Sequence, residues 1–141
     1  MKSDRELFSD VAKDHEWCLL CGSTNPRSLH LKFEPEEGGV RAEFTPGRNL
    51  QGYSGILHGG VVSALLDSAM THCLFSSGIK AVTADLHVRF LHSVPYNQLL
   101  VIRAWIVSSK HPLYLLKSEL VQGSTIMARA EAKFMRQEGH Q

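Results

Sequence analysis

The chain has 141 residues, of which 43% are hydrophobic and 21% are charged, and its formal net charge is +1. This composition excludes an intrinsically disordered chain, and the nearly balanced charge argues against a nucleic-acid binder, which usually carries a basic excess. A small anionic ligand fits this charge, because it needs only a few local cations. We expect one domain over residues 1–141, since this length supports a single hydrophobic core.

The first predicted element is a short amphipathic helix. Apolar residues recur between charged ones from Asp4 to Asp14, and Ser3 is placed to cap the helix. With its flanks, this helix occupies residues 1–17. The N-terminus has no apolar region typical of a secretion signal, and no run is apolar enough to cross a membrane. Three cysteines, an odd number, do not suggest a disulfide framework. We therefore expect a cytoplasmic protein with free thiols and no membrane partner.

A loop rich in cysteine, glycine and proline follows over residues 18–28. Its Cys18-x-x-Cys21 pair has the spacing of half a zinc site, but structural zinc usually needs a second such pair, and none follows at a suitable distance. A redox site of the thioredoxin type would need a βαβ context, which the sequence lacks. We expect two thiols in a turn and no bound metal.

Six strands are predicted, two before and four after a long helix. Apolar and polar residues alternate in Leu29–Pro35 and in Gly39–Pro46, and a hairpin turn joins these two runs. The later strands are expected at Ala81–Val94, Leu99–Ser109, Leu113–Gln122 and Thr125–Arg136. Short connections between them favour antiparallel neighbours. Residues 136–141 are expected to form a loose tail.

The long helix is predicted over Gly59–Ser77, with Gly78 as its stop signal. Apolar residues cover most of its circumference, so it is expected to have protein on nearly every side. One antiparallel sheet that curves around a central helix buries that helix and leaves one sheet face in water. The predicted fold class is therefore α+β, with about six strands wrapped around one apolar helix.

Two features of this helix point to chemistry. His58-Gly59-Gly60 stands where the loop enters the helix, and the unpaired N–H groups and partial positive charge there can hold an anion or polarise a carbonyl. Asp67 follows about two turns later, and a carboxylate in apolar surroundings suits a nucleophile or a general base. The alternatives are glycines that only allow close packing and an aspartate that is a hydrogen-bonded structural residue.

Four histidines are candidate partners of the aspartate. His58 is the best placed of them, at the mouth of the helix, whereas His72, His87 and His92 are more readily explained as hydrogen-bonded structural residues. The sequence has neither a glycine-rich phosphate loop of the Walker type nor the Gly-x-Ser-x-Gly motif of serine hydrolases. A classical serine hydrolase is therefore not expected.

Three stretches resemble one known family. GILHGGVVSALLDSAM resembles the signature helix of the hot-dog-fold acyl-CoA thioesterases, of the 4-hydroxybenzoyl-CoA and phenylacetate-pathway type. CLLCGSTNPRSLHLKF resembles the opening of a subgroup of that superfamily, and AVTADLHVRFLHSVP resembles the strand after the helix. The resemblance implies a hot-dog fold and hydrolysis of an acyl-CoA. It implies no cofactor beyond the coenzyme A of the substrate, and a homodimer or dimer of dimers with shared active sites.

The resemblance also implies roles for single residues. Asp67 matches the catalytic carboxylate, and Gly59 matches the glycine whose N–H polarises the thioester carbonyl. Thr83 matches a Ser or Thr that helps to place water and comes from the partner subunit in many members, and His58 matches the motif histidine near the leaving thiol. The substrate-binding candidates are Gly60, then Gln51 and Asn49 for an amide whose usual position falls on Gly52. For the phosphates of coenzyme A, Arg89 and His92 are candidates among scattered cations, most of which a solvated strand face explains equally well; the others are Arg48, Lys80, Lys110 and Arg136.

Two other functions remain open on the sequence. A non-catalytic acyl-CoA-binding protein of the same fold would use Asp67 only as a structural residue. A hydratase of the same fold would place its acid and its histidine together at the start of the helix, and here the acid lies deeper. The sequence does not specify the acyl group.

Overall fold

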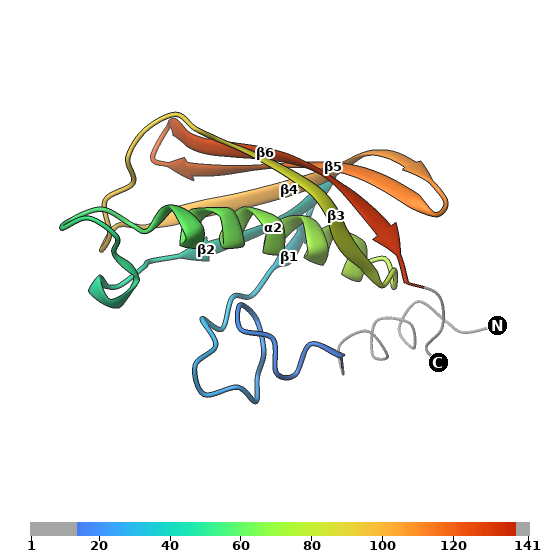
Figure 1. The fold of residues 1–141 in the computed structure, drawn as a ribbon, viewed down its shortest axis with the longest axis horizontal. Coiled ribbons are helices and arrows are strands. Elements are labelled where there is room, and N and C mark those ends of the chain that lie inside the picture. The colour runs from blue at the N-terminus through green and yellow to red at the C-terminus, as the bar shows by residue number, and fades with distance from the viewer. Residues whose placement is uncertain (1–13, 138–141) are drawn as a thin grey trace.

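The computed structural model describes residues 14–137, in which one helix is combined with a six-stranded sheet (Figure 1). The predicted N-terminal helix lies outside the described residues except for Asp14, as do residues 138–141 of the tail. The elements are β1 (Glu34–Glu36), β2 (Gly39–Phe44), the 3₁₀ turn η1 (Arg48–Leu50), α2 (Gly59–Phe75), β3 (Ala81–Phe90), β4 (Leu100–Lys110), β5 (Leu113–Gln122) and β6 (Thr125–Arg136).

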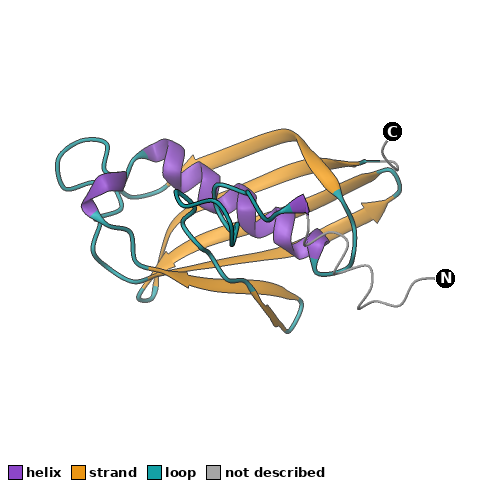
Figure 2. Ribbon diagram, turned by 90° about the horizontal axis from the view of Figure 1, so that it is seen from below, coloured by secondary structure: helices purple, strands orange, loops and turns teal. Residues whose placement is uncertain are grey.

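The sheet is antiparallel throughout, with the strand order β1-β2-β4-β5-β6-β3. It curves over α2, which runs along one face of the sheet and touches five of the six strands (Figures 1 and 2). Since β3 is last in the order, one of its two edges has no neighbouring strand within the described chain. This arrangement confirms the predicted α+β class.

The sequence of α2 explains both its burial and its ends. Apolar side chains that point in most directions are fully buried, as predicted for a central helix. His58 caps the first turn through its side chain. Gly78, at φ +73°, ends the helix, and the N–H of Ile79 donates to the carbonyl of Leu74 at 3.0 Å. No helix among the described residues is long and apolar enough to cross a membrane.

Alternation along β6 sets the face that the helix contacts. Ala128, Ala130 and Ala132 are buried, whereas the residues between them are exposed. Small side chains at these positions let the helix lie close to the sheet, and Phe134 fills the space beyond them. The outer face carries the polar residues of the same strands, as predicted for a sheet with one wet face.

The prediction of a strand at Leu29–Pro35 is wrong for most of that segment. Only Glu34–Glu36 forms a strand there. His30 adopts a positive φ of 54°, which interrupts the extended run. The N–H groups of Leu29 and Leu31 donate to the carbonyls of Leu19 and Leu20 in the cysteine loop instead of to the sheet. The alternating pattern therefore marks a segment that pairs with a loop.

One strand end and the start of the tail also differ from the prediction. The strand predicted to reach Val94 ends at Phe90, because the N–H groups of Leu91 and His92 both turn to the carbonyl of Met127. Arg136 belongs to β6 and not to the tail, and its N–H donates to the carbonyl of Pro112 at 2.8 Å.

Candidate active site

The start of α2 presents one unoccupied backbone donor. The ring of His58 folds back, and its Nδ1 accepts the N–H of Gly60 at 2.8 Å. The next two N–H groups, of Val61 and Val62, donate to the carbonyl of His58. Within residues 14–137, the N–H of Gly59 has no hydrogen-bond acceptor. The free N–H of Gly59 therefore lies at the positive end of the helix dipole.

Glycine fits positions 59 and 60 for different structural reasons. A Cβ at position 60 would lie 3.0 Å from Nδ1 of His58 and would press on the capping ring. A Cβ at position 59 would meet only the ring of Phe90, at an ordinary contact distance of 3.7 Å. Gly60 thus lets the histidine cap the helix. Since Nδ1 is an acceptor, the neutral His58 ring carries its proton on Nε2.

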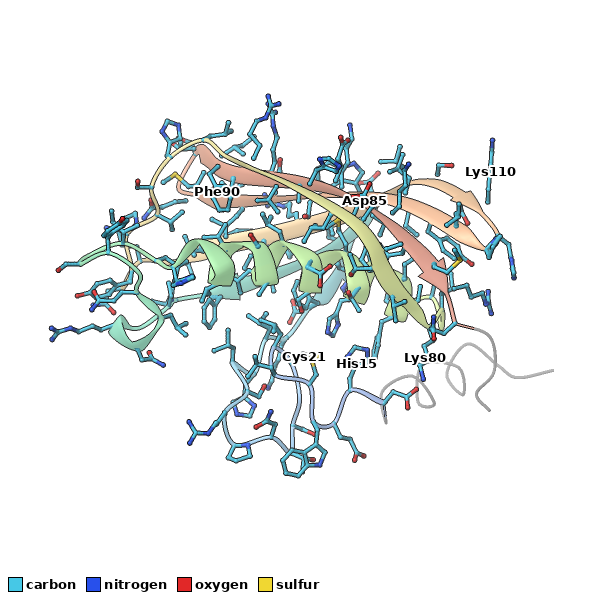
Figure 3. The ribbon with its side chains drawn as sticks, viewed as in Figure 1. His15, Cys21, Lys80, Asp85, Phe90 and Lys110 are labelled. Atoms are coloured by element: carbon cyan, nitrogen blue, oxygen red, sulfur yellow. The ribbon has the colours of Figure 1, made fainter. Side chains whose placement is uncertain are left out.

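The free N–H opens into a hollow of about 650 Å³. Its walls come from the loop before α2, the first turn of the helix and the end of β3, where Phe90 lies (Figure 3). The lining residues are Gly52, Tyr53, Ile56, Leu57, His58, Gly59, Val62, Phe90, Leu91, His92, Ser93 and Val94. The hollow is mostly apolar, and its polar side chains are those of Tyr53, His58, His92 and Ser93.

Asp67 is held on the side of the helix that faces β3. Its Oδ1 accepts a hydrogen bond of 2.6 Å from Oγ1 of Thr83 in the same chain. The pairing of β3 with β6 is irregular between Thr83 and Asp85, and such a bulge re-aims the side chains around it. The structure thus brings together two of the predicted catalytic residues, and it places both on one chain.

The free N–H and the carboxylate are far apart within one chain. Asp67 lies eight positions after Gly59 on α2, which corresponds to about 12 Å along a helix axis. Neither Asp67 nor Thr83 lines the hollow at the helix start. A single thioester carbonyl cannot contact both groups of the same chain, so one chain holds two separate halves of a site.

Comparison with known proteins shows which proteins the chain resembles. The sequence pattern of the thioesterase superfamily matches residues 54–111, which contain both halves of the site. The fold is also that of the E. coli PaaI protein from the phenylacetic acid degradation operon, with a TM-score of 0.80, 17% identity, and 96% of this chain and 100% of that chain covered. The chain has the hot-dog fold, and residues 54–111 are similar to the thioesterase superfamily.

Two further proteins resemble the chain. The human acyl-coenzyme A thioesterase THEM5 is 32% identical over 69 residues, which are 49% of this chain and 28% of THEM5. The chain thus spans about a quarter of the length of that curated relative. A hypothetical thioesterase from Streptococcus pneumoniae, solved with coenzyme A, has a TM-score of 0.71 and 18% identity, with 75% of this chain and 87% of that chain covered.

The remaining predicted residues of this hot-dog chain lie outside the two halves or at their border. The amide of Gln51 is engaged in its own loop, where its Oε1 accepts the N–H of Gly55 at 3.2 Å. Gln51 and Asn49 do not line the hollow, whereas Gly52 does. Arg89 lies in a separate hollow on the outer face of the sheet, beside Arg129. Of the two predicted phosphate contacts, only His92 adjoins the helix start.

The other histidines differ in their surroundings. His87 is exposed and lies 3.5 Å from Asp85 on the same strand. His72 is largely buried, stacks on Phe33 with ring centroids 4.6 Å apart, and has its pKa lowered to about 4 mainly by that burial. Sequence reasoning missed His15, which lies beside Cys18 and Cys21. The position of His15, three residues before Cys18, could have revealed this neighbour. It was missed because a zinc partner was sought only after the cysteines in the sequence.

Burial and hydrogen bonding act in opposite directions on Asp67. Removal from water raises the pKa of its carboxyl above the usual 3.8, and the hydrogen bond from Thr83 partly offsets this rise. We therefore expect Thr83→Val to raise the pKa of Asp67 further. Carboxyl-carbon NMR of the labelled protein measures both midpoints. A midpoint in Thr83→Val at or below that of the unaltered protein would contradict the role given to this hydrogen bond.

Proposed function

We propose that the chain hydrolyses acyl-CoA thioesters at active sites that two copies of the chain build together. The observation that carries this proposal is the separation of the two halves, a free helix-end N–H at Gly59 and an Asp67–Thr83 pair two turns away. The similarity of residues 54–111 to the thioesterase superfamily and the coenzyme A of the S. pneumoniae protein support the substrate class.

The exposed edge of β3 supports the pairing of two copies. Val82 and Phe90 on this strand are 48% and 53% exposed, and an unpaired apolar edge favours addition of another strand. A twofold axis would pair two β3 strands in antiparallel orientation. Within one chain, Thr83 adjoins Asp67 and Phe90 adjoins Gly59. Antiparallel pairing would therefore bring the Asp67 end of one chain to the Gly59 end of the other.

The two halves supply complementary chemistry. The N–H of Gly59 donates to the thioester oxygen and stabilises the oxyanion, an effect of about 3–4 kcal/mol for one well-placed donor. The partner subunit's Asp67 accepts a proton from water as the water oxygen attacks the carbonyl carbon, while Thr83 fixes one carboxylate oxygen. The C–S bond then breaks, and the departing sulfur takes up the proton from Asp67. The products are the free acid and coenzyme A.

The hollow at the helix start is suited to hold the part of the substrate around the thioester sulfur. Nε2–H of His58 is a donor placed next to the free N–H of Gly59, and His92 adds a second titratable group at its rim. We propose that His92 contacts the part of coenzyme A nearest the helix start. Arg89 cannot reach that part, because it faces the outer surface of the sheet. Binding of a more distant phosphate by Arg89 stays a prediction.

Thiol release tests the proposed reaction. The protein is incubated with short, long and aromatic acyl-CoAs, and free coenzyme A is titrated with a chromogenic thiol reagent. Hydrolysis predicts steady release that depends on enzyme concentration, with at least one acyl class preferred. Tight binding of acyl-CoAs without thiol release would instead favour a non-catalytic binding protein and would contradict the proposal.

A further inference from the structure

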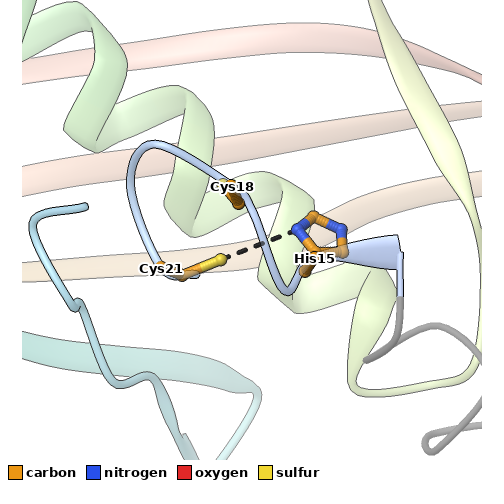
Figure 4. A group of neighbouring side chains, drawn as sticks. All are labelled: His15, Cys18 and Cys21. Atoms are coloured by element: carbon orange, nitrogen blue, oxygen red, sulfur yellow. Dashed lines mark hydrogen bonds between the residues drawn. The ribbon is translucent and has the colours of Figure 1, made fainter. Parts of the chain in front are cut away.

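The N-terminal loop contains a cluster of metal-ligating side chains that the proposed reaction does not use. Nδ1 of His15 and the Sγ atoms of Cys18 and Cys21 all lie within 4.8 Å of one another (Figure 4). They come from one short segment with the spacing His-x-x-Cys-x-x-Cys. The cluster packs below the C-terminal half of α2, away from the hollow at the helix start (Figure 3).

One ligand distance in this cluster suits zinc. In a tetrahedral site, Zn–S bonds of about 2.3 Å and Zn–N bonds of about 2.0 Å place a nitrogen and a sulfur ligand about 3.6 Å apart. The structure has Nδ1 of His15 and Sγ of Cys21 at 3.6 Å. A thiol hydrogen bond to the imidazole gives the same distance, so the two arrangements must be separated by experiment.

The backbone around the cysteines is shaped for sulfur ligation. The N–H of Leu20 points at Sγ of Cys18 at 3.4 Å, and such donors stabilise a thiolate. The N–H of Gly22 donates to the carbonyl of Cys18 at 2.8 Å and closes the turn. A Cβ at position 22 would lie 2.5 Å from the carbonyl oxygen of Glu16, so only glycine fits there. This tight turn directs both thiols to the same side as His15.

An unpartnered nitrogen lies next to the cluster. Nε2 of His72 is buried and has no hydrogen-bond partner among the described residues. His72 lines the same pocket as His15 and Cys21, and the two histidine rings are 5.7 Å apart. Buried polar atoms are rarely left without a partner. A water molecule bound to a metal in this pocket would supply one.

We infer that His15, Cys18 and Cys21 bind one zinc ion, with solvent in the fourth position beside His72. Binding exchanges two thiol protons for the ion, so the site becomes neutral and two protons are released. The ion would fasten the loop to α2, because His15 also packs on Phe75 with ring centroids 4.8 Å apart. This site shares no residue with the two halves of the proposed active site.

Metal content of the untagged protein tests the inference. We expect about one zinc per chain by mass spectrometry after purification without chelator. Zinc added to the reduced, chelator-treated protein should compete with a chromogenic zinc indicator and should raise the melting temperature. Cobalt should give the visible bands of a tetrahedral site and a thiolate charge-transfer band, which a thiol–imidazole hydrogen bond cannot produce.

Substitutions assign the ligands. Cys18→Ser, Cys21→Ser and His15→Asn should each weaken zinc binding by about tenfold or more. Cys73→Ser is the matched control, since Cys73 is a free, buried cysteine on α2 outside the cluster. It should bind zinc as the unaltered chain does. The inference is overturned if the reduced, unaltered protein takes up no zinc from the indicator, or if zinc binding survives in Cys18→Ser and Cys21→Ser.

Discussion

Replacement of Asp67 by asparagine is expected to lower kcat for acyl-CoA hydrolysis by about 10²–10⁴-fold, the usual effect of removing a general base. The amide keeps the size of the carboxyl group, and its oxygen can still accept the hydrogen bond from Thr83. Initial rates of thiol release, with substrate at saturating concentration, measure the loss.

The fold should survive this substitution. Burial raises the pKa of Asp67, so the folded state disfavours the charged form, and this penalty is present at every pH above the raised pKa. A neutral amide removes the penalty, so the melting temperature of Asp67→Asn at neutral pH should equal or exceed that of the unaltered chain. Full activity in this folded variant would exclude Asp67 from the reaction.

The pH dependence of the unaltered enzyme follows from the same group. Hydrolysis needs the carboxylate form of Asp67, so the rate should fall as the pH drops through the raised pKa of this carboxyl. In Thr83→Val, the loss of the hydrogen bond should move this fall in rate to higher pH. The shift should parallel that of the Asp67 midpoint measured by NMR.

Replacement of Gly59 by proline is expected to lower kcat by about 10²–10³-fold, because proline has no N–H to donate to the oxyanion. Proline is well tolerated as the first residue of a helix, which is the position of Gly59. The preceding residue, His58, has φ −59° and ψ 133°, an extended conformation that a following proline permits. The substitution therefore removes one donor and keeps the helix.

Gly59→Ala is the matched control for this test. It keeps the N–H, and its Cβ meets only the ring of Phe90 at 3.7 Å. Its kcat should remain within a few-fold of the unaltered enzyme. Equal loss of activity in the alanine and proline variants, with both folded by circular dichroism, would assign the effect to crowding of the hollow and not to a missing oxyanion donor.

Periodicity predicted the fold well where long elements meet one core. The central helix and the four later strands could be located because an all-round apolar run and an alternating run have different periods. The segment Leu29–Phe33 alternates as a strand does, but His30 turns it with a positive φ and it pairs with the cysteine loop. Short alternating runs do not specify which backbone they will pair with.

Candidate site residues could be named by residue type and by resemblance, but their geometry could not be predicted. His58, Gly59, Asp67 and Thr83 were named from the sequence, yet the contact of Thr83 with Asp67 depends on an irregular register that no spacing rule gives. Gly60 was a substrate-binding candidate, but the ring of His58 occupies its N–H. A hydrogen bond between a side chain and the backbone next to it cannot be predicted from residue types alone.

The central claim is that each active site combines Gly59 of one chain with the partner subunit's Asp67, and mixed dimers test it most directly. Heterodimers of an Asp67→Asn chain and a Gly59→Pro chain are purified through two different tags and assayed for thiol release. Each heterodimer contains one intact site if the halves come from different chains. We predict about half of the activity of the unaltered dimer. Heterodimers as inactive as their two parents would place both groups in the same chain and contradict the claim.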